Sequence, residues 1–283
     1  MDYPALYKSA DNLSGDSQKV FYGVLASNLL ALTIAAFISL VNSVEAWAAI
    51  VQTITLLIAL GSTIYLFAIR PERQWYEARA IAESIKTITW RYSSRVHPYD
   101  DSDELDRRQF LETLKKLIEL NAAVTKKLSK YLDEALITDK MQAMRELPLQ
   151  ERIKRYVQGR VQNQLRWYSN KSKINAKLAK RFFIALIVAN SIALLSSLLK
   201  IYCPIFQYWP IDVFVAIACS LLSWIQARRY SENSTAYALA SQEICIIKEQ
   251  SLLVKNEEEF HEYVTNAENA FSREHTQWIA KLS

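Results

Sequence analysis

Long stretches without a charged residue alternate along this chain with stretches rich in lysine, arginine and glutamate. Residues 20–44 carry no charge, and residues 46–69 form a second uncharged window of similar length. A helix needs about 20 apolar residues, at 1.5 Å per residue, to cross the hydrocarbon core of a bilayer. The pattern therefore predicts membrane-spanning helices over about 20–41 and 46–69, joined by a turn at residues 42–45.

A second pair of windows follows after a long polar segment. Residues 182–199 are short but very apolar, and residues 211–225 form a weaker window that opens after Pro210 with Asp212 in its first turn. Proline and an acidic residue are ordinary at a helix start. We expect spans over about 182–200 and 209–227, so the predicted fold class is all-α, a polytopic membrane protein with four transmembrane helices in two hairpins.

The polar segments have the periodicity of helices rather than strands. The sequence "HPYDDSD" interrupts the first of them, and Pro148 begins a run in which Gly159 alone could break a helix. We expect a cytosolic helical bundle that is continuous with the spans. Its helices are predicted over residues 72–96, 103–136, 149–181 and 228–283, within two successive units, 1–140 and 141–283.

Positive charge collects at one side of every predicted span. The loop between the first two spans has no lysine or arginine, and the loop between the last two has Lys200 alone at its edge. Loops rich in lysine and arginine stay in the cytoplasm. We therefore expect both termini and the middle segment to be cytoplasmic. The basic flanks contain Lys19, Arg70, Arg73, Arg79, Lys171, Lys173, Lys177, Lys180, Arg181, Arg228 and Arg229.

Composition argues against several kinds of chemistry. The chain has only 4 glycines, 3 cysteines and 3 histidines, and these are too scattered for a phosphate loop, a zinc site or a catalytic triad. We therefore expect no enzyme activity, no metal and no cofactor. The net charge of +5 lies beside the predicted membrane, so DNA or RNA binding is not expected.

Two amphipathic stripes mix tryptophans with charges. In the stretch 75–92, Arg79 and Lys86 share a helical face with Trp75 and Trp90, and before the third span Arg160 and Lys171 share a face with Trp167. One interpretation is polar contact between helices, with tryptophans at the membrane interface. The other is an inter-subunit or ligand-sensing surface, because cations and indoles suit phosphate and base recognition.

An internal duplication is indicated by short similarities. "SNLLAL" in the first span resembles "ANSIAL" in the third, which pairs Asn28 with Asn190. Polar residues at helical spacing inside the spans serve helix packing or line a pore. The candidates are Asn28, Ser39 and Asn42 in the first span, and Asn190 and Ser197 in the third.

These patterns carry a family resemblance. The residues Trp75, Arg79, Ala80, Ala82, Glu83, Lys86, Trp90 and Tyr92 resemble the helix that follows the hairpin in the bacterial SLATT family of two-span membrane effector domains. A second SLATT subgroup has a similar helix before its hairpin and a similar C-terminal ending. The matching residues are Arg160, Val161, Gln164, Trp167, Tyr168, Lys171 and Asn175, and the ending is "AENAFSREHTQW".

The resemblance implies a tandem SLATT protein of the bacterial inner membrane that forms pores or disrupts membranes in antiviral conflict. Its trigger would be a cyclic oligonucleotide or a nucleotide-sensing protein. The family motif defines no ligand contacts, and the chemistry of the two stripes makes Arg79, Lys86, Arg160 and Lys171 the candidate ligand or inter-subunit contacts. Four helices are too few to enclose a channel, so we expect a homo-oligomer in a lipid bilayer. The alternative is a non-conducting scaffold or receptor whose cytosolic helices dock a soluble partner.

Overall fold

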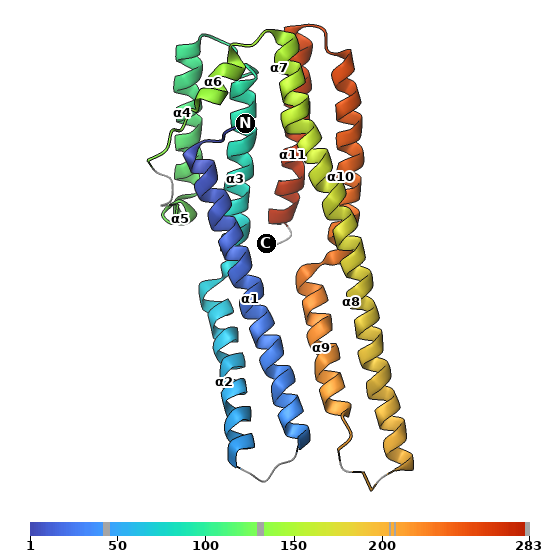
Figure 1. The fold of residues 1–283 in the computed structure, drawn as a ribbon. Coiled ribbons are helices and arrows are strands. Elements are labelled where there is room, and N and C mark those ends of the chain that lie inside the picture. Colours follow the sequence, from blue (N-terminus) through green and yellow to red (C-terminus); the bar gives the residue numbers. More distant parts are fainter. Residues whose placement is uncertain (42–45, 129–132, 204, 207, 281–283) are drawn as a thin grey trace. The chain divides into compact units, whose positions relative to one another are not determined.

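A computed structural model of the chain describes residues 1–41, 46–128, 133–203, 205–206 and 208–280, with side chains described up to residue 272. Every regular element in these ranges is helical, which confirms the all-α prediction (Figure 1). The elements are α1 (Ala5–Val41), α2 (Ala46–Ile69), α3 (Pro71–Ser93), α4 (Asp103–Leu120), α5 (Ala122–Thr125), α6 (Asp139–Arg145), α7 (Leu149–Tyr156), the π-helix η1 (Val157–Val161), α8 (Gln162–Tyr202), α9 (Ile211–Arg228), α10 (Tyr230–Gln250), the 3₁₀ turn η2 (Ser251–Leu253) and α11 (Glu257–Ala280).

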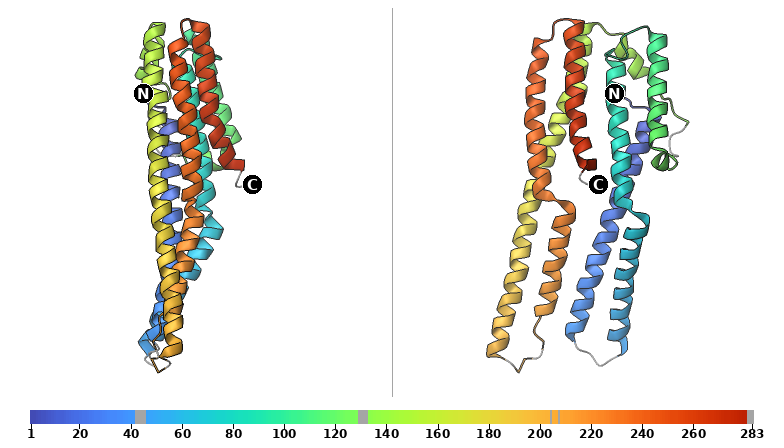
Figure 2. Two further views of the ribbon diagram at one scale, coloured as in Figure 1. Left: turned by 90° about the vertical axis from the view of Figure 1, so that its right-hand side faces the viewer. Right: turned by 180° about the vertical axis from the view of Figure 1, so that it is seen from behind.

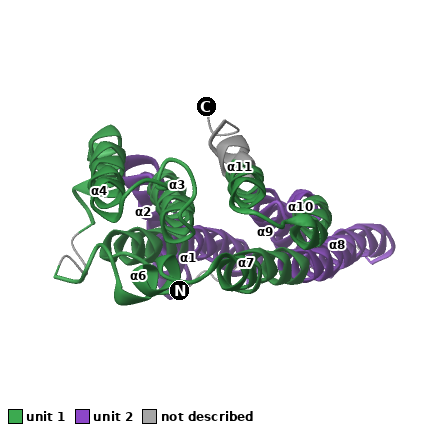
Figure 3. Cartoon of the chain, turned by 90° about the horizontal axis from the view of Figure 1, so that it is seen from above, with its two compact units in different colours: residues 1–18, 72–170, 237–283 green, residues 19–71, 171–236 purple. Residues whose placement is uncertain are grey.

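The chain folds into two compact units that each draw on both halves of the sequence. Unit 1 contains residues 1–18, 72–170 and 237–283, and unit 2 contains residues 19–71 and 171–236 (Figure 3). Unit 1 thus gathers both terminal segments and the middle segment, whereas unit 2 collects the apolar windows. Helices α1, α8 and α10 contribute residues to both units, and α3 has its first residue, Pro71, in unit 2.

Unit 2 consists of two antiparallel helical hairpins, α1 with α2 and α8 with α9 (Figures 1 and 2). The described part of the chain holds four helices long and apolar enough to cross a membrane. Many of their large apolar side chains are exposed, for example Leu57 at 60 %, Phe67 at 76 % and Phe183 at 59 %. An aqueous surface rarely carries so much contiguous apolar area, so these faces are suited to lipid.

Hydroxyl and aromatic contacts join the two hairpins of unit 2. The hydroxyls of Thr33 on α1 and Ser220 on α9 lie 3.2 Å apart. The guanidinium of Arg228 lies 3.6 Å from the centre of the Tyr22 ring and 5.0 Å from that of Trp224. A cation over an aromatic face is attracted by the ring quadrupole, so Arg228 contributes to packing as well as to the basic flank.

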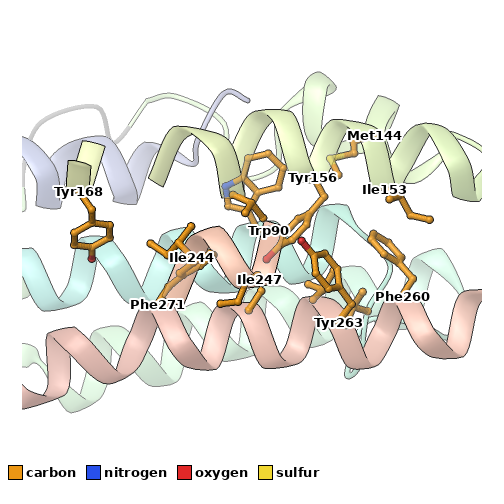
Figure 4. Close-up of a cluster of buried hydrophobic side chains, with 14 residues drawn as sticks. Trp90, Met144, Ile153, Tyr156, Tyr168, Ile244, Ile247, Phe260, Tyr263 and Phe271 are labelled. Atoms are coloured by element: carbon orange, nitrogen blue, oxygen red, sulfur yellow. The ribbon is translucent and has the colours of Figure 1, made fainter. Parts of the chain in front are cut away.

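One of the two core clusters of unit 1 contains aromatic side chains supplied by α3, α7 and α11. Tyr156 lies between Trp90 and Tyr263, with ring-centre distances of 5.6 and 6.0 Å, and both pairs meet edge to face (Figure 4). Trp90 is 2 % exposed and Tyr156 is fully buried. Edge-to-face aromatic pairs add about 0.5–1.5 kcal/mol beyond the area they bury, so this cluster contributes strongly to holding the three helices together.

The second arm of each hairpin continues directly into the bundle, with one left-handed residue at the junction. Arg70 joins α2 to α3 and Arg229 joins α9 to α10, each with φ at 49°. The N–H of Arg70 donates to the carbonyl of Leu66, and that of Arg229 donates to the carbonyl of Ile225. These bonds satisfy carbonyls at the end of each span.

The helix predicted over residues 103–136 is shorter in the structure. Helix α4 ends at Leu120, and α5 adds a single turn over Ala122–Thr125. The side-chain amide of Asn121 donates a hydrogen bond to the Leu117 carbonyl. The Thr125 hydroxyl lies within hydrogen-bond distance of the carbonyls of Ile118 and Asn121. Side chains that bond nearby backbone in this way compete with helical hydrogen bonds, so the polar pair ends the helix.

The run that begins at Pro148 stays helical but widens at Gly159, inside the π-helical turn η1. A Cβ atom at this position would lie 2.8 Å from Cη2 of Trp90. The glycine therefore lets the indole pack directly on the backbone. Single π turns in longer helices frequently occur at functional sites, so residues 157–161 are a candidate part of such a site.

Candidate functional site

The mixed face of α3 is internal, and its charges are paired with one another. Trp75 and Trp90 are buried. The ammonium group of Lys86 lies 3.0 Å from the Glu83 carboxylate, and the guanidinium of Arg79 lies 3.9 Å from it. Glu83 thus forms ion pairs with two cations of its own helix. This face contacts other parts of unit 1 through its tryptophans and through paired charges.

Lys86 lies in a largely desolvated position. Burial lowers the pKa of its ammonium group, while the adjacent Glu83 carboxylate acts in the opposite direction. The ammonium group also lies 5.4 Å from the centre of the Tyr7 ring on α1. Lys86 thus links α3 to the first turns of α1 inside unit 1.

The second mixed stripe is divided between the two units. Arg160 is buried in unit 1, and Trp167 packs edge to face on Tyr237 with the Arg79 guanidinium 5.4 Å from its ring centre. Lys171 belongs to unit 2, where its carbonyl accepts a hydrogen bond from the Asn175 side chain. Three of the four candidate cations therefore belong to unit 1, namely Arg79, Lys86 and Arg160. The fourth, Lys171, belongs to unit 2.

Arg160 is bonded to Glu268 of α11. Its Nε donates to Oε1 at 2.9 Å and its Nη2 donates to Oε2 at 2.7 Å. The hydroxyl of Tyr156 donates to Oε1 at 2.9 Å, and the hydroxyl of Thr87 on α3 donates to Oε2 at 2.8 Å. A bidentate guanidinium–carboxylate pair is among the strongest polar contacts in proteins. We call Thr87, Tyr156, Arg160 and Glu268 the Glu268 network.

The Glu268 network is shielded from water. Glu268 is 0 % exposed and Arg160 is 2 % exposed. Burial and the neighbouring carboxylate raise the pKa of Tyr156 well above its ordinary value, so this hydroxyl stays a donor. Burial lowers the pKa of Arg160, but the charge and hydrogen bonds of Glu268 outweigh this and raise it. Both groups therefore keep the protonation states that the network requires.

Glu268 was not predicted as a site residue, although it lies in the ending "AENAFSREHTQW". Apolar residues Phe260, Val264, Ala267 and Phe271 are buried along one face of α11, and Glu268 lies on that same face. A carboxylate on a buried stripe needs a partner. A carboxylate within an otherwise apolar helical face is therefore the sequence feature that indicated a buried cationic partner elsewhere in the chain.

A second buried pair was also missed. Arg145 on α6 is 4 % exposed and donates from Nη2 to Asp106 on α4 at 2.5 Å and to Asp103 at 3.0 Å. Its Nη1 donates to the carbonyl of Tyr92, whose ring centre lies 4.4 Å from the guanidinium. This arginine ties α3, α4 and α6 together, so it is a structural link of the bundle.

The polar candidates in the spans have different surroundings. The Asn28 amide donates to the Ala59 carbonyl at 2.8 Å and to the Thr63 hydroxyl at 3.0 Å, and it thereby joins α1 to α2. Asn190 donates to Leu186 in its own helix and is exposed. Ser39 and Ser197 are exposed as well. Asn42 lies outside the described residues.

Family profiles match nearly the whole chain. Residues 4–153 match SMODS and SLOG-associating 2TM effector domain 3, and residues 156–278 match SMODS and SLOG-associating 2TM effector domain 1. A search of curated proteins found no match, and neither did a search of solved structures. With its four candidate spans, the chain is a multi-pass membrane protein. It belongs to the SLATT family, with two of the family's effector domains in tandem.

Proposed function

We propose that this protein is a homo-oligomeric effector that permeabilises the bacterial inner membrane when a cyclic nucleotide or a nucleotide-sensing partner engages unit 1. SLATT effector domains are associated with antiviral defence systems. Conduction is assigned to the spans of unit 2 and signal reception to unit 1. No catalytic step is part of the proposal.

The observation that carries the proposal is the polar face of α8. Asn190 and Ser197 are two helical turns apart and exposed, on a side that also exposes Phe183 and Leu194. Polar groups that face lipid are costly and tend to be covered by other helices or by water. Contact between copies of the chain through this face would cover them and would supply the helices that one subunit lacks for a channel.

Two independent features support the proposed orientation. Basic residues flank the spans at the ends that enter unit 1. Unit 1 also contains both terminal segments and the middle segment. A hairpin of two spans separates each of these segments from the next, which agrees with all three lying on one side of the membrane. The proposed side is the cytoplasm, where a nucleotide signal would be present.

Membrane potential in expressing cells tests the conducting role. Induced expression is expected to depolarise the cells, and Asn190→Leu is expected to reduce depolarisation because it removes the exposed amide from α8. Asn28→Leu combined with Asn190→Leu should reduce it further. Asn170→Leu is the matched control, since Asn170 is an exposed asparagine of the same helix within unit 1. Equal depolarisation by all variants at equal expression would remove the asparagines from the pore.

The second candidate function is a non-conducting scaffold whose bundle docks a soluble protein. The exposed charges of α4 favour it, for example Glu104 and Arg108, which pair with each other at the surface. Dye leakage from vesicles separates the two functions. A purified protein that never releases dye, with or without nucleotides, would support the scaffold.

A further inference from the structure

A pocket with a volume of about 500 Å³ opens in unit 1 beside the π turn. It is formed by side chains of α3, α6 and α7 and by η1, together with Met1. Pockets for small molecules typically measure about 300–1,000 Å³. The volume therefore suits a small organic molecule and greatly exceeds that of a single phosphate ion.

The charged lining of the pocket is mainly cationic. The lining contains three cationic side chains, those of Lys140, Lys154 and Arg155, and one carboxylate, that of Glu151. Lys140 pairs with Asp2 at 2.9 Å and Lys154 pairs with Glu151 at 3.7 Å, and all four side chains are about half exposed or more. Exposed ion pairs of this kind contribute little free energy, so a multiply charged anion can compete with both carboxylates.

Arg155 is the strongest anchor for an anion in this pocket. It is exposed on α7, and it forms no ion pair with any residue in the described part of the chain. A guanidinium presents its N–H groups in a planar fork that matches phosphate oxygens. The arginine is thus available to a ligand without first giving up a partner.

Apart from Gln158, the rest of the lining is apolar. Trp90 and Met144 contribute from the core, and Gly159 leaves the backbone bare against the indole. A side chain at position 159 would collide with the indole ring, so the glycine is required for this arrangement. The lining therefore combines cations that suit a phosphate with an indole and other apolar groups that suit a ring.

We propose that this pocket binds a phosphorylated, ring-bearing small molecule of the nucleotide class, anchored by Arg155 with Lys140 and Lys154. The identity of the ligand as a signal rests on the function proposed above. Arg79, Lys86, Arg160 and Lys171 do not line the pocket. The pocket is therefore a separate site from the cations that the sequence singled out.

The pocket is connected to the C-terminal helix through one short segment. Arg155 and Gln158 line the pocket, while Tyr156 and Arg160 in the same stretch bond to Glu268 of α11. A ligand that pulls on Arg155 and Gln158 acts on the turn that positions the Glu268 network. Ligand binding is therefore expected to change the protection of the α11 backbone amides against hydrogen exchange.

Calorimetry on the full-length protein in detergent tests the proposal. The probes are cyclic dinucleotides with guanine or adenine bases, the corresponding linear dinucleotides, nucleoside triphosphates and inorganic phosphate. At least one nucleotide should bind, and Arg155→Glu should weaken its binding at least tenfold. Arg166→Glu is the matched control, because Arg166 is another exposed arginine of unit 1 without an ion-pair partner among the described residues. It should change the affinity less than twofold.

Three results would overturn the proposal. They are binding of none of the nucleotides, equal loss of affinity in both variants, and displacement of the nucleotide by phosphatidylglycerol through Arg155, which would assign the pocket to a lipid headgroup. Vesicle leakage is measured separately on the same protein. Binding without leakage would contradict the proposed function and leave the pocket standing, whereas leakage without binding would contradict the pocket alone.

Discussion

At the scale of single residues, Glu268 concentrates the polar interactions of unit 1. Its carboxylate accepts hydrogen bonds from Thr87, Tyr156 and Arg160, which come from three different elements. A buried charge without a partner is costly, whereas a fully bonded one fixes the geometry of its neighbours. The network therefore determines how α11 packs against α3 and α7.

Removal of the cation from this network should strongly destabilise unit 1. Arg160→Met leaves the Glu268 carboxylate buried without its counter-ion, and loss of one partner of a buried pair costs about 3–5 kcal/mol. Unfolding in mixed micelles, as denaturing detergent is increased, measures this free energy. Arg108→Met breaks the exposed pair with Glu104 and should cost less than about 1 kcal/mol. Similar costs for the two variants would contradict the role given to Glu268.

Gly159 permits a second residue-scale prediction. Alanine at this position places a Cβ 2.8 Å from the Trp90 ring, which is buried and cannot swing aside. Overpacking of this kind costs about 1–3 kcal/mol. Gly15→Ala is the control, because a Cβ at position 15 in α1 meets nothing within 4 Å and alanine favours helix by up to about 1 kcal/mol. Thermal unfolding should therefore shift in opposite directions, and a stabilising Gly159→Ala would refute the contact.

At the scale of elements, the two hairpins repeat the same junction. Each first arm is uninterrupted from the bundle into the span, as α1 and α8 show, and each second arm has a left-handed arginine directly after the span. The left-handed conformation costs a non-glycine residue about 1–2 kcal/mol. Both junctions carry this conformational cost at the residue that directly follows the span, which agrees with the tandem family match.

Substitution at the first junction tests whether this backbone conformation is strained. Arg70→Gly should raise the midpoint of thermal unfolding slightly or leave it unchanged, because glycine adopts positive φ without a steric penalty. Lys116→Gly, on an exposed interior position of α4, should lower it by the equivalent of about 1 kcal/mol. Equal losses in both variants would mean that residue 70 does not adopt the left-handed conformation.

At the scale of the whole molecule, orientation in the membrane can be measured with the native cysteines. Cys203 follows α8 in the loop between the third and fourth spans, Cys219 lies within α9, and Cys245 lies on α10. All three side chains are exposed. A membrane-impermeant maleimide therefore reads out which side of the membrane each position occupies.

Three variants that each retain one cysteine should give three different labelling patterns. With the bundle in the cytoplasm, Cys203 should react in cells with a permeabilised outer membrane alone, and Cys245 should react after the inner membrane is opened too. Cys219 should react poorly in both conditions, because it lies within a candidate span, where a membrane-impermeant reagent does not reach it. Labelling of Cys245 before Cys203 would place the bundle outside the cytoplasm and contradict the proposed orientation.

The sequence by itself determined the helical class, the positions of the four apolar helices and the family. These properties depend on local features, since a charge-free window of about 20 residues is visible without any knowledge of its neighbours. The ion pairs of Glu83 were also accessible, because Arg79 and Lys86 lie one turn away on the same helix.

Tertiary structure alone decided which polar residues are buried and what they bond. Arg160 was a plausible surface cation until α11 brought Glu268 against it from 108 positions further along the chain. The pocket beside η1 likewise combines Trp90 with residues of α6 and α7. Such contacts depend on which helix faces lie opposite one another, and helical periodicity describes a face without naming its partner.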